Sequence, residues 1–300
     1  MKKSILVAGA TGNLGARICS ALIHKGASVK AIVRPAADPE KVKNLVSMGV
    51  EVIEAEFSDV DALSNTCTGV SCVVSALAGL ADVIVDTQKN ILDAAVKAGV
   101  PRFIASDFCT DYTQLVPGAN RNFDLRRTFR GYLDTQPIQA SSVFNGAFAD
   151  ILKYNTPILN LKDQSIAYWG DKADWKLDFT TMDDTAAFTA EVALDDDAPR
   201  DLQIASFQVS PNMIQADVKE ASGNEFAIRK LSGMEEFKQS IVKQRAENPA
   251  GEHELYAKWQ QGQYMYSMFS THHAELANSR YAQLTWTSAL TFIKSFVKPV

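Results

Sequence analysis

The sequence predicts an α/β fold with a doubly wound parallel sheet and a smaller, mainly helical C-terminal lobe. In the first half of the chain, short β-branched runs alternate with longer segments of helical period, which is the pattern of βαβ units. The runs at residues 5–8 and 72–74 are continuously apolar, as expected for parallel strands buried on both faces. A glycine-rich turn also follows the first run directly and opens the first helix. These three observations favour one large sheet flanked by helices.

Each element follows from its local pattern. The expected strands lie at residues 4–8, 29–33, 51–55, 70–75, 102–105 and 139–144. The expected helices lie at residues 14–25, 39–48, 83–98 and 122–134, and glycines at positions 26, 49 and 99 stop the first three. After about residue 144 the rhythm changes: we expect a long loop at 162–173, a solvated acidic turn at 195–197 and mainly helices from 210 to 300. The sequence contains no internal repeat and no low-complexity linker.

Composition excludes several classes of protein. The 300 residues are 46% hydrophobic and 22% charged, which excludes a disordered or fibrous chain. Thirty Lys and Arg against 35 Asp and Glu give a net charge of −5, so we expect no nucleic-acid partner. Four scattered cysteines do not make a disulfide scaffold or a metal site, and no apolar stretch is long enough for a membrane span. We therefore expect a cytoplasmic protein with no membrane partner and no metal.

The most informative motif is the GxxGxxG sequence that runs from Gly9 to Gly15. Gly9 allows a tight turn out of the strand, Gly12 lets the backbone approach a pyrophosphate, and Gly15 lets helix and sheet pack closely. Free N–H groups and the helix dipole favour an anion at this point. Because the motif has a strand before it and a helix after it, it predicts a dinucleotide-binding domain of the Rossmann type. A ligand-free structural turn is the alternative.

The end of the second expected strand indicates which dinucleotide binds. An NAD site usually places a carboxylate here for the ribose 2′-hydroxyl, whereas a 2′-phosphate requires a cation. Residues 31–34 contain no carboxylate and end in Arg34, whose planar fork matches a phosphate. The sequence therefore predicts a preference for NADP(H), with a merely solvated Arg34 as the alternative.

Several longer motifs together resemble one known family. Besides the turn at 9–15 and Arg34, they are the run QKNILDAA at 88–95, the run GVPRFIASDF at 99–108, the run YWGD at 168–171, the run FTTMDD at 179–184 and Arg280-Tyr281. In these motifs the chain resembles the NmrA-like and isoflavone-reductase-like branch of the atypical short-chain dehydrogenases/reductases. The resemblance is tight up to Phe108 and looser in the remaining chain. It implies an NADP-binding domain at residues 1–150 and a substrate-binding lobe at 151–300, with more than one crossing between them.

The resemblance also implies site residues. The positions that would hold the cofactor are Gly9, Thr11, Gly12, Asn13, Leu14, Gly15, Arg34, Ser75, Ala76, Leu77, Gln88, Ser106, Asp107, Phe108, Phe144 and Asn145. Within this set, Ser106–Phe108 and Phe144–Asn145 would flank the nicotinamide. The positions expected to line the substrate pocket are Phe108, Tyr112, Phe144 and Phe148. Most of these positions lie at or near the carboxyl ends of expected parallel strands, where open α/β sheets bind ligands.

One position departs from the family pattern. Reductases of this family carry a proton-handling lysine on the helix after the 106–108 segment, but residues 122–130 contain none, and Arg126 aligns with that position. A guanidinium stays protonated, so it can stabilise an oxyanion but not exchange a proton. The arginines of this helix equally fit a solvated face. Asp107 and Tyr112 are the candidates for proton transfer, with Arg126 as the charge-stabilising candidate.

Other catalytic patterns are weaker. Tyr168 and Lys172 match the letters of a Tyr-x-x-x-Lys pair, but a strand-like run followed by a Gly-Asp turn does not give the helical face that the pair needs. Adjacent histidines on a helix diverge by about 100°, so His272 and His273 are not expected to share a metal ion.

Two functions from different classes remain. The first is an oxidoreductase that transfers hydride from NADPH to a small apolar or aromatic carbonyl, enone or quinone, with the cofactor supplying the chemistry. The second is a non-catalytic NADP(H)-binding redox sensor of the NmrA type, which would pass the oxidation state to a protein partner. The missing lysine fits the sensor, and the retained C-terminal lobe favours the enzyme. We therefore favour the enzyme.

Overall fold

The computed structural model describes residues 2–298, and these residues form two compact units. The first unit comprises the chain up to Phe108 together with Asn122–Phe144 and Thr185–Leu202. The second comprises Cys109–Arg121, Asn145–Asp184 and the chain from Gln203 onward. The chain therefore passes between the units several times. The assignment of cofactor binding to residues 1–150 and of substrate binding to residues 151–300 stays a prediction.

The first unit is built on a seven-stranded sheet with the strand order β10-β6-β5-β4-β1-β2-β3. Its strands are β1 (Ser4–Ala8), β2 (Ser28–Val33), β3 (Glu51–Glu54), β4 (Cys72–Ser75), β5 (Arg102–Ile104), β6 (Gln139–Phe144) and β10 (Asp201–Gln203). β1 pairs in parallel with both β2 and β4, so that Ala8 lies opposite Ile32 on one side and Ser75 on the other. The direction of chain progression reverses at β1, and such a switch point is where doubly wound sheets bind ligands. The predicted fold class is confirmed.

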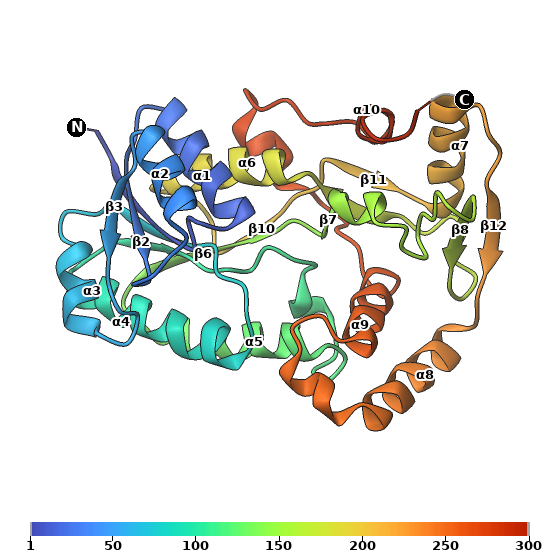
Figure 1. Cartoon of the computed structure of the whole chain (residues 1–300), viewed down its shortest axis with the longest axis horizontal. Coiled ribbons are helices and arrows are strands. Elements are labelled where there is room, and N and C mark those ends of the chain that lie inside the picture. The colour runs from blue at the N-terminus through green and yellow to red at the C-terminus, as the bar shows by residue number, and fades with distance from the viewer. Residues whose placement is uncertain (1, 299–300) are drawn as a thin grey trace. The chain divides into compact units, whose positions relative to one another are not determined.

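Helices cover both faces of this sheet (Figure 1). α1 (Asn13–His24), α2 (Pro39–Ser47) and α6 (Met182–Leu194) lie on one face, and α3 (Val60–Thr66), α4 (Gln88–Lys97) and α5 (Arg121–Leu133) lie on the other. Side chains of β1 alternate between the two faces of the sheet. Leu6 and Ala8 lie in the apolar core that also contains Phe103 and Phe129. The rings of Phe103 and Phe129 lie 6.1 Å apart, which fixes α5 on β5.

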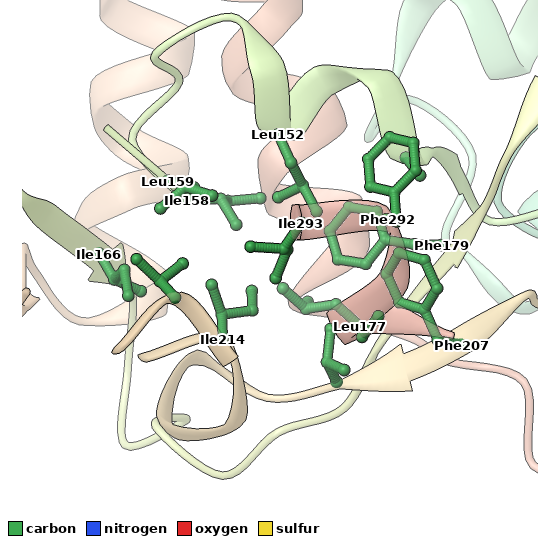
Figure 2. Close-up of a cluster of buried hydrophobic side chains, with 14 of the residues drawn as sticks. Leu152, Ile158, Leu159, Ile166, Leu177, Phe179, Phe207, Ile214, Phe292 and Ile293 are labelled. Carbon is green, nitrogen blue, oxygen red and sulfur yellow. The ribbon is translucent and has the colours of Figure 1, made fainter. Parts of the chain in front are cut away.

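The second unit combines short strands with helices. A three-stranded sheet has the order β11-β9-β7, and a two-stranded sheet pairs β12 with β8. The strands are β7 (Ala147–Phe148), β8 (Ser165–Tyr168), β9 (Leu177–Thr180), β11 (Phe207–Val209) and β12 (Ala227–Lys230). The α-helices are α7 (Pro211–Ser222), α8 (Met234–Glu247), α9 (Lys258–Met268) and α10 (Ala289–Lys294). Figure 2 shows the apolar core of this unit, in which side chains such as Leu177, Ile214 and Ile293 point toward one another.

Some sequence expectations are wrong. The expected loop at 162–173 contains β8, a short strand that needs its partner β12 and gives little local signal. The helix expected at 83–98 begins as a π-helix, Asp82–Thr87, and continues as α4. The short helix α3 was not expected, and His272 and His273 lie in irregular chain after α9 rather than on a helix. The strand 139–144 and the exposed acidic turn at 195–197 are confirmed.

Candidate functional site

The turn between β1 and α1 packs so tightly that Gly9 and Gly15 have no room for a side chain. Gly9 has a φ of +82°, and a Cβ on it would lie 2.5 Å from the carbonyl oxygen of Ala76. A Cβ on Gly15 would lie 2.2 Å from the carbonyl oxygen of Gly9, and one on Gly12 would lie 3.2 Å from the same atom. The N–H of Gly12 donates to the carbonyl of Gly9 at 3.0 Å and closes the turn. The structure therefore confirms that this turn needs its glycines.

The N-terminus of α1 offers backbone N–H groups to a ligand. Gly12 is the N-cap, has extended backbone and supplies no side-chain cap. The first N–H groups of a helix have no partner inside it, and the helix dipole adds positive potential there. The side-chain oxygen of Asn13 accepts from Nε of Arg17 at 2.9 Å, and contact of Asn13 with a cofactor stays a prediction. This arrangement suits a diphosphate.

A buried orphan hydroxyl lies at the end of β4, beside this turn. Ser75 is fully buried, lies opposite Ala8 in the sheet, and its Oγ has no hydrogen-bond partner among the described residues. A buried hydroxyl without a partner is costly unless a ligand or water completes it. Together with a turn that a Cβ would fill, this atom shows that the residues present fit a dinucleotide.

Arg34 lies directly after β2 and is exposed to solvent. It begins a turn in which the N–H of Ala37 donates to the carbonyl of Arg34 at 3.1 Å, and Ala36 adopts a positive φ of 61°. A left-handed alanine costs about 1 kcal/mol, so this turn is held against local preference. The strand end therefore presents a cation and no carboxylate, as the sequence predicted.

At the end of β5, every polar group of Ser106 has a partner in the first unit. Its N–H donates to Oε1 of Gln88 at 3.1 Å, and its hydroxyl donates to the carbonyl of Leu77 at 2.6 Å. Its carbonyl accepts from Nε of Arg126 at 3.1 Å. The structure thus brings together four of the predicted site residues at one strand end.

Gln88 connects three segments rather than offering its amide to solvent. It is 1% exposed, and Nε2 donates to the carbonyl of Ile84 in the π-helix at 2.6 Å while Oε1 accepts from Ser106. Local π-helical geometry is frequent at functional sites. Gln88 therefore shapes the edge of the sheet between β4 and β5, and direct contact with a cofactor stays a prediction.

Asp107, the next residue, is held by groups that the sequence analysis missed. Its Oδ2 accepts from the hydroxyl of Ser142 on β6 at 2.7 Å. The same Ser142 oxygen accepts from Nη1 of Arg200 at 2.6 Å. A serine in a buried strand and an arginine before a short strand carry no motif, so only the fold shows this arrangement.

The arginines of α5 do not form a uniform solvated face. Arg126 contacts the end of β5, and Arg130 forms two hydrogen bonds with the carboxylate of Asp201, at 2.6 and 2.8 Å. Arg127 lies 3.8 Å from the carboxylate of Asp124. Arg126 is therefore not merely solvated, and its role in the site stays a prediction.

The remaining predicted positions divide between the units. Phe108 and Phe144 are buried in the first unit. Tyr112, Asn145 and Phe148 belong to the second: Tyr112 is fully buried in the 3-10 turn Tyr112–Gln114, and the carbonyl of Asn145 accepts from Thr180 at 2.7 Å. A pocket shared by Phe108, Tyr112, Phe144 and Phe148 stays a prediction.

A second polar cluster, also missed from sequence, lies in the second unit. His273 has a fully buried ring, and its Nδ1 is 3.7 Å from Oδ2 of Asp178, which also accepts from the His273 backbone N–H at 2.8 Å. Burial lowers the pKa of His273, and the charges of Asp178 and Asp111 oppose this shift. Both groups lie outside any sequence motif, so the pairing depends on tertiary packing.

The rejected Tyr-x-x-x-Lys pair does lie in non-helical chain: Tyr168 ends β8, and Gly170 follows with a φ of +63°.

Within residues 2–298, the structure contains no cluster of three metal-ligating side chains. Over the same residues, no helix combines the length and apolarity that a membrane crossing requires.

Comparison with known proteins identifies the family. The model of the NmrA-like family matches residues 1–279, so the chain belongs to the NmrA-like family. Among curated relatives, pinoresinol reductase 2 of Arabidopsis thaliana is 30% identical over 208 residues, which cover 65% of each protein. The isoflavone reductase homolog of Lupinus albus is 30% identical over 229 residues, covering 71% of this chain and 72% of that protein.

The matched regions set the scope of these comparisons. The match spans 65% of the length of the first curated relatives, slightly less than two thirds. The solved structure of AtPrR2 with NADP⁺ and (+)-pinoresinol superposes with a TM-score of 0.80 at 24% identity, covering 99% of each chain. This likeness shows the fold. The family resemblance predicted from the motifs is confirmed.

Proposed function

We propose that this protein is an NADP(H)-dependent oxidoreductase that reduces a small apolar or aromatic carbonyl, enone or quinone. When bound, NADPH supplies a hydride from C4 of its ring, so that the acceptor gains two electrons and then a proton while the cofactor becomes NADP⁺. The observation that carries the proposal is the turn from Gly9 to Gly15, in which a Cβ on Gly9 or Gly15 would clash with neighbouring backbone and which leads directly into the N-terminus of α1. The relatives named as reductases support it.

In this proposal each strand end has its own task. The backbone N–H groups at 9–15 bind the diphosphate, and the hydroxyl of Ser75 completes its hydrogen bonding on the cofactor. Arg34 binds the 2′-phosphate. Residues Ser106–Phe108 and Phe144–Asn145 flank the nicotinamide, and residues 1–150 form the cofactor domain.

The proposed chemistry uses a charge and two proton-transfer candidates. Arg126 stabilises negative charge that develops on the acceptor, while Asp107 and Tyr112 are the candidates for proton transfer. Residues 151–300 form the substrate lobe, and Phe108, Tyr112, Phe144 and Phe148 supply apolar surface for a small-molecule substrate. Four buried free thiols fit a cytoplasmic protein.

Calorimetric titration of the full-length protein with NADPH and NADH tests the cofactor assignment. We expect tighter binding of NADPH. Arg34→Ala should weaken NADPH binding about 10- to 100-fold, the worth of a charge-assisted hydrogen bond, and leave NADH binding nearly unchanged. Lys41→Ala, which changes an exposed cation on α2, is the matched control. Equal affinities for the two cofactors in the unsubstituted protein would refute the NADP(H) preference.

A panel of quinones, enones and aromatic carbonyls tests the reaction. We expect acceptor-dependent loss of the NADPH absorbance with at least one class. Tight NADPH binding without turnover on any of them would overturn the enzyme assignment and favour the redox sensor, for which the lysine-free helix α5 is the supporting feature.

A further inference from the structure

Within the first unit, Ser142 lies between a buried carboxylate and an arginine. Its hydroxyl oxygen is 2.7 Å from Oδ2 of Asp107 and 2.6 Å from Nη1 of Arg200. Ser142 is fully buried, and Asp107 is 1% exposed. The N–H of Ser142 also donates to the carbonyl of Arg200 at 2.7 Å. Two hydrogen bonds therefore join the serine and the arginine.

The chemistry of the donors sets the direction of these hydrogen bonds. A guanidinium can only donate, so the oxygen of Ser142 must accept from Arg200. The hydroxyl carries a single proton, and the geometry directs it to Asp107. Oδ2 of Asp107 is therefore an acceptor, with a cation one hydroxyl away. The donated proton and the nearby cation favour the ionised carboxylate, whereas the burial of Asp107 opposes it.

The other carboxylates near this arginine, Asp134 and Asp201, also pair with Arg130. Arg200 donates from Nε to Oδ1 of Asp134 at 3.0 Å, and its Nη1 lies 3.6 Å from Asp201. Asp201 in turn receives two hydrogen bonds from Arg130. Arg130 and Arg200 therefore share these two carboxylates.

The approach to Asp107 from α5 is also positive. Arg126 donates to the carbonyl of Ser106, the residue immediately before Asp107. Arg200 approaches through Ser142 from the chain before β10. Both arginines therefore favour negative charge on Asp107.

We propose that Arg200 is a positioning residue which, through Ser142, holds Asp107 as a fixed negative charge at the carboxyl end of β5. This inference rests on the proposed function, in which the nicotinamide lies beside residues 106–108. A fixed carboxylate there stabilises the positively charged nicotinamide of NADP⁺ relative to the neutral ring of NADPH. Asp107 then serves as a charge rather than as the proton donor, which leaves Tyr112 as the proton-transfer candidate.

The test measures the dissociation constants of NADP⁺ and NADPH with the full-length protein across about pH 5 to 9, where a carboxylate released from its partners would titrate. The readout is the ratio of the two constants, which does not require turnover. Asp107→Asn should shift the ratio about tenfold toward NADPH, because it removes one charge interaction. In Ser142→Ala and Arg200→Met the shift should appear only as the pH falls, since the carboxylate then takes up a proton more readily. Arg200→Lys, which keeps the positive charge, should shift the ratio of the two constants less at low pH than Arg200→Met does.

Ser141 provides a matched control on the same strand. It is as buried as Ser142, but its hydroxyl accepts from Nη2 of Arg102 at 3.3 Å rather than contacting Asp107. Ser141→Ala should cost similar stability and leave the ratio and its pH dependence unchanged. The inference is overturned if the Asp107 and Ser142 variants bind both cofactors with an unaltered ratio, in which case the proposed function stands. Absence of binding in the unsubstituted protein would overturn both.

Discussion

The carboxyl ends of β1 and β5 lie at the same edge of one parallel sheet but are constructed differently. At the end of β1, Gly9 and Gly15 carry no side chain, and this allows the backbone of neighbouring segments to pack directly against them. At the end of β5, Ser106 and Asp107 are held by side chains and carbonyls from other elements. The end of β1 depends on a few nearby residues that lack side chains. The end of β5 depends on hydrogen bonds from segments that are distant in the sequence.

This difference determines how each end responds to change. The partners of Ser106 and Asp107 lie 18 to 35 residues away along the chain, so they are in place only when the sheet is complete. The glycine turn closes within three residues, through the hydrogen bond from Gly12 to Gly9. Substitutions at the β1 end should therefore act through steric exclusion, and those at the β5 end through lost hydrogen bonds.

The largest effect is expected from Gly9→Ala. The new Cβ would meet the Ala76 carbonyl at 2.5 Å in a left-handed conformation, and the strain and displacement should cost about 3 kcal/mol of unfolding free energy. The displaced backbone should also weaken NADPH binding about 100-fold or more. Urea unfolding and calorimetric titration measure the two quantities.

Gly26→Ala separates backbone strain from steric exclusion. Gly26 has a similar φ of +78°, but nothing lies within 4 Å of the added Cβ. It should cost only about 1 kcal/mol and leave cofactor binding intact. Equal effects of the two substitutions on binding would show that the β1 end does not act by exclusion.

Gln88→Leu should have the next largest effect, because it removes the buried hydrogen bonds that Gln88 makes with the N–H of Ser106 and the carbonyl of Ile84. The expected loss is about 2 kcal/mol of unfolding free energy. As a control, Gln239→Leu on the exposed face of α8 should change stability by less than about 0.5 kcal/mol. A Gln88 variant as stable as the control would show that the β5 end does not depend on this side chain.

The chain that follows β5 should show an acid-dependent effect of intermediate size. Burial raises the pKa of Asp111, but hydrogen bonds from Thr113, Gln203 and Gln114 outweigh burial and hold it below its ordinary value of 3.8. A lowered pKa stabilises the folded state above the unfolded value, and this stabilisation is lost as the pH falls through the folded value. Asp111→Asn should therefore flatten the decline of unfolding free energy below about pH 4.

Asp61→Asn serves as the exposed control for this measurement. Lys97 lowers the pKa of Asp61 through a hydrogen bond, but the pair is open to solvent. Solvent screening should make its acid-dependent effect much smaller. An equal flattening of the decline of unfolding free energy below about pH 4 in both variants would show that the hydrogen bonds to Asp111 do not stabilise the segment after β5.

The smallest effect is expected from Asn13→Ala at the β1 end. Its side-chain oxygen accepts a hydrogen bond from the exposed Arg17, and in the proposed function Asn13 contributes its backbone N–H. NADPH affinity should change by no more than about twofold. A tenfold loss would show that side chains, and not only backbone, contribute at this end.

Much of the fold and one half of the candidate site are predictable from sequence because their causes are local. β-branched runs, helical periods and terminating glycines place most elements of the first unit within a few residues of their observed bounds. β8 and the π-helical turn at 82–87 escape prediction, because a short strand needs its partner and a π-turn differs from an α-turn only in which carbonyl each N–H reaches.

The sequence by itself determined the strand–turn–helix from Gly9 to Gly15 and the cation at Arg34, since both follow from the allowed conformations and charge of adjacent residues. Only the tertiary structure decided that Ser142 and Arg200 hold Asp107, and that Gln88 joins Ser106 to the π-helix. Hydrogen bonds of this kind form between groups that are remote in sequence, so no local pattern records them. They become specific when the completed sheet removes water from buried donors and acceptors and leaves each with a single available partner.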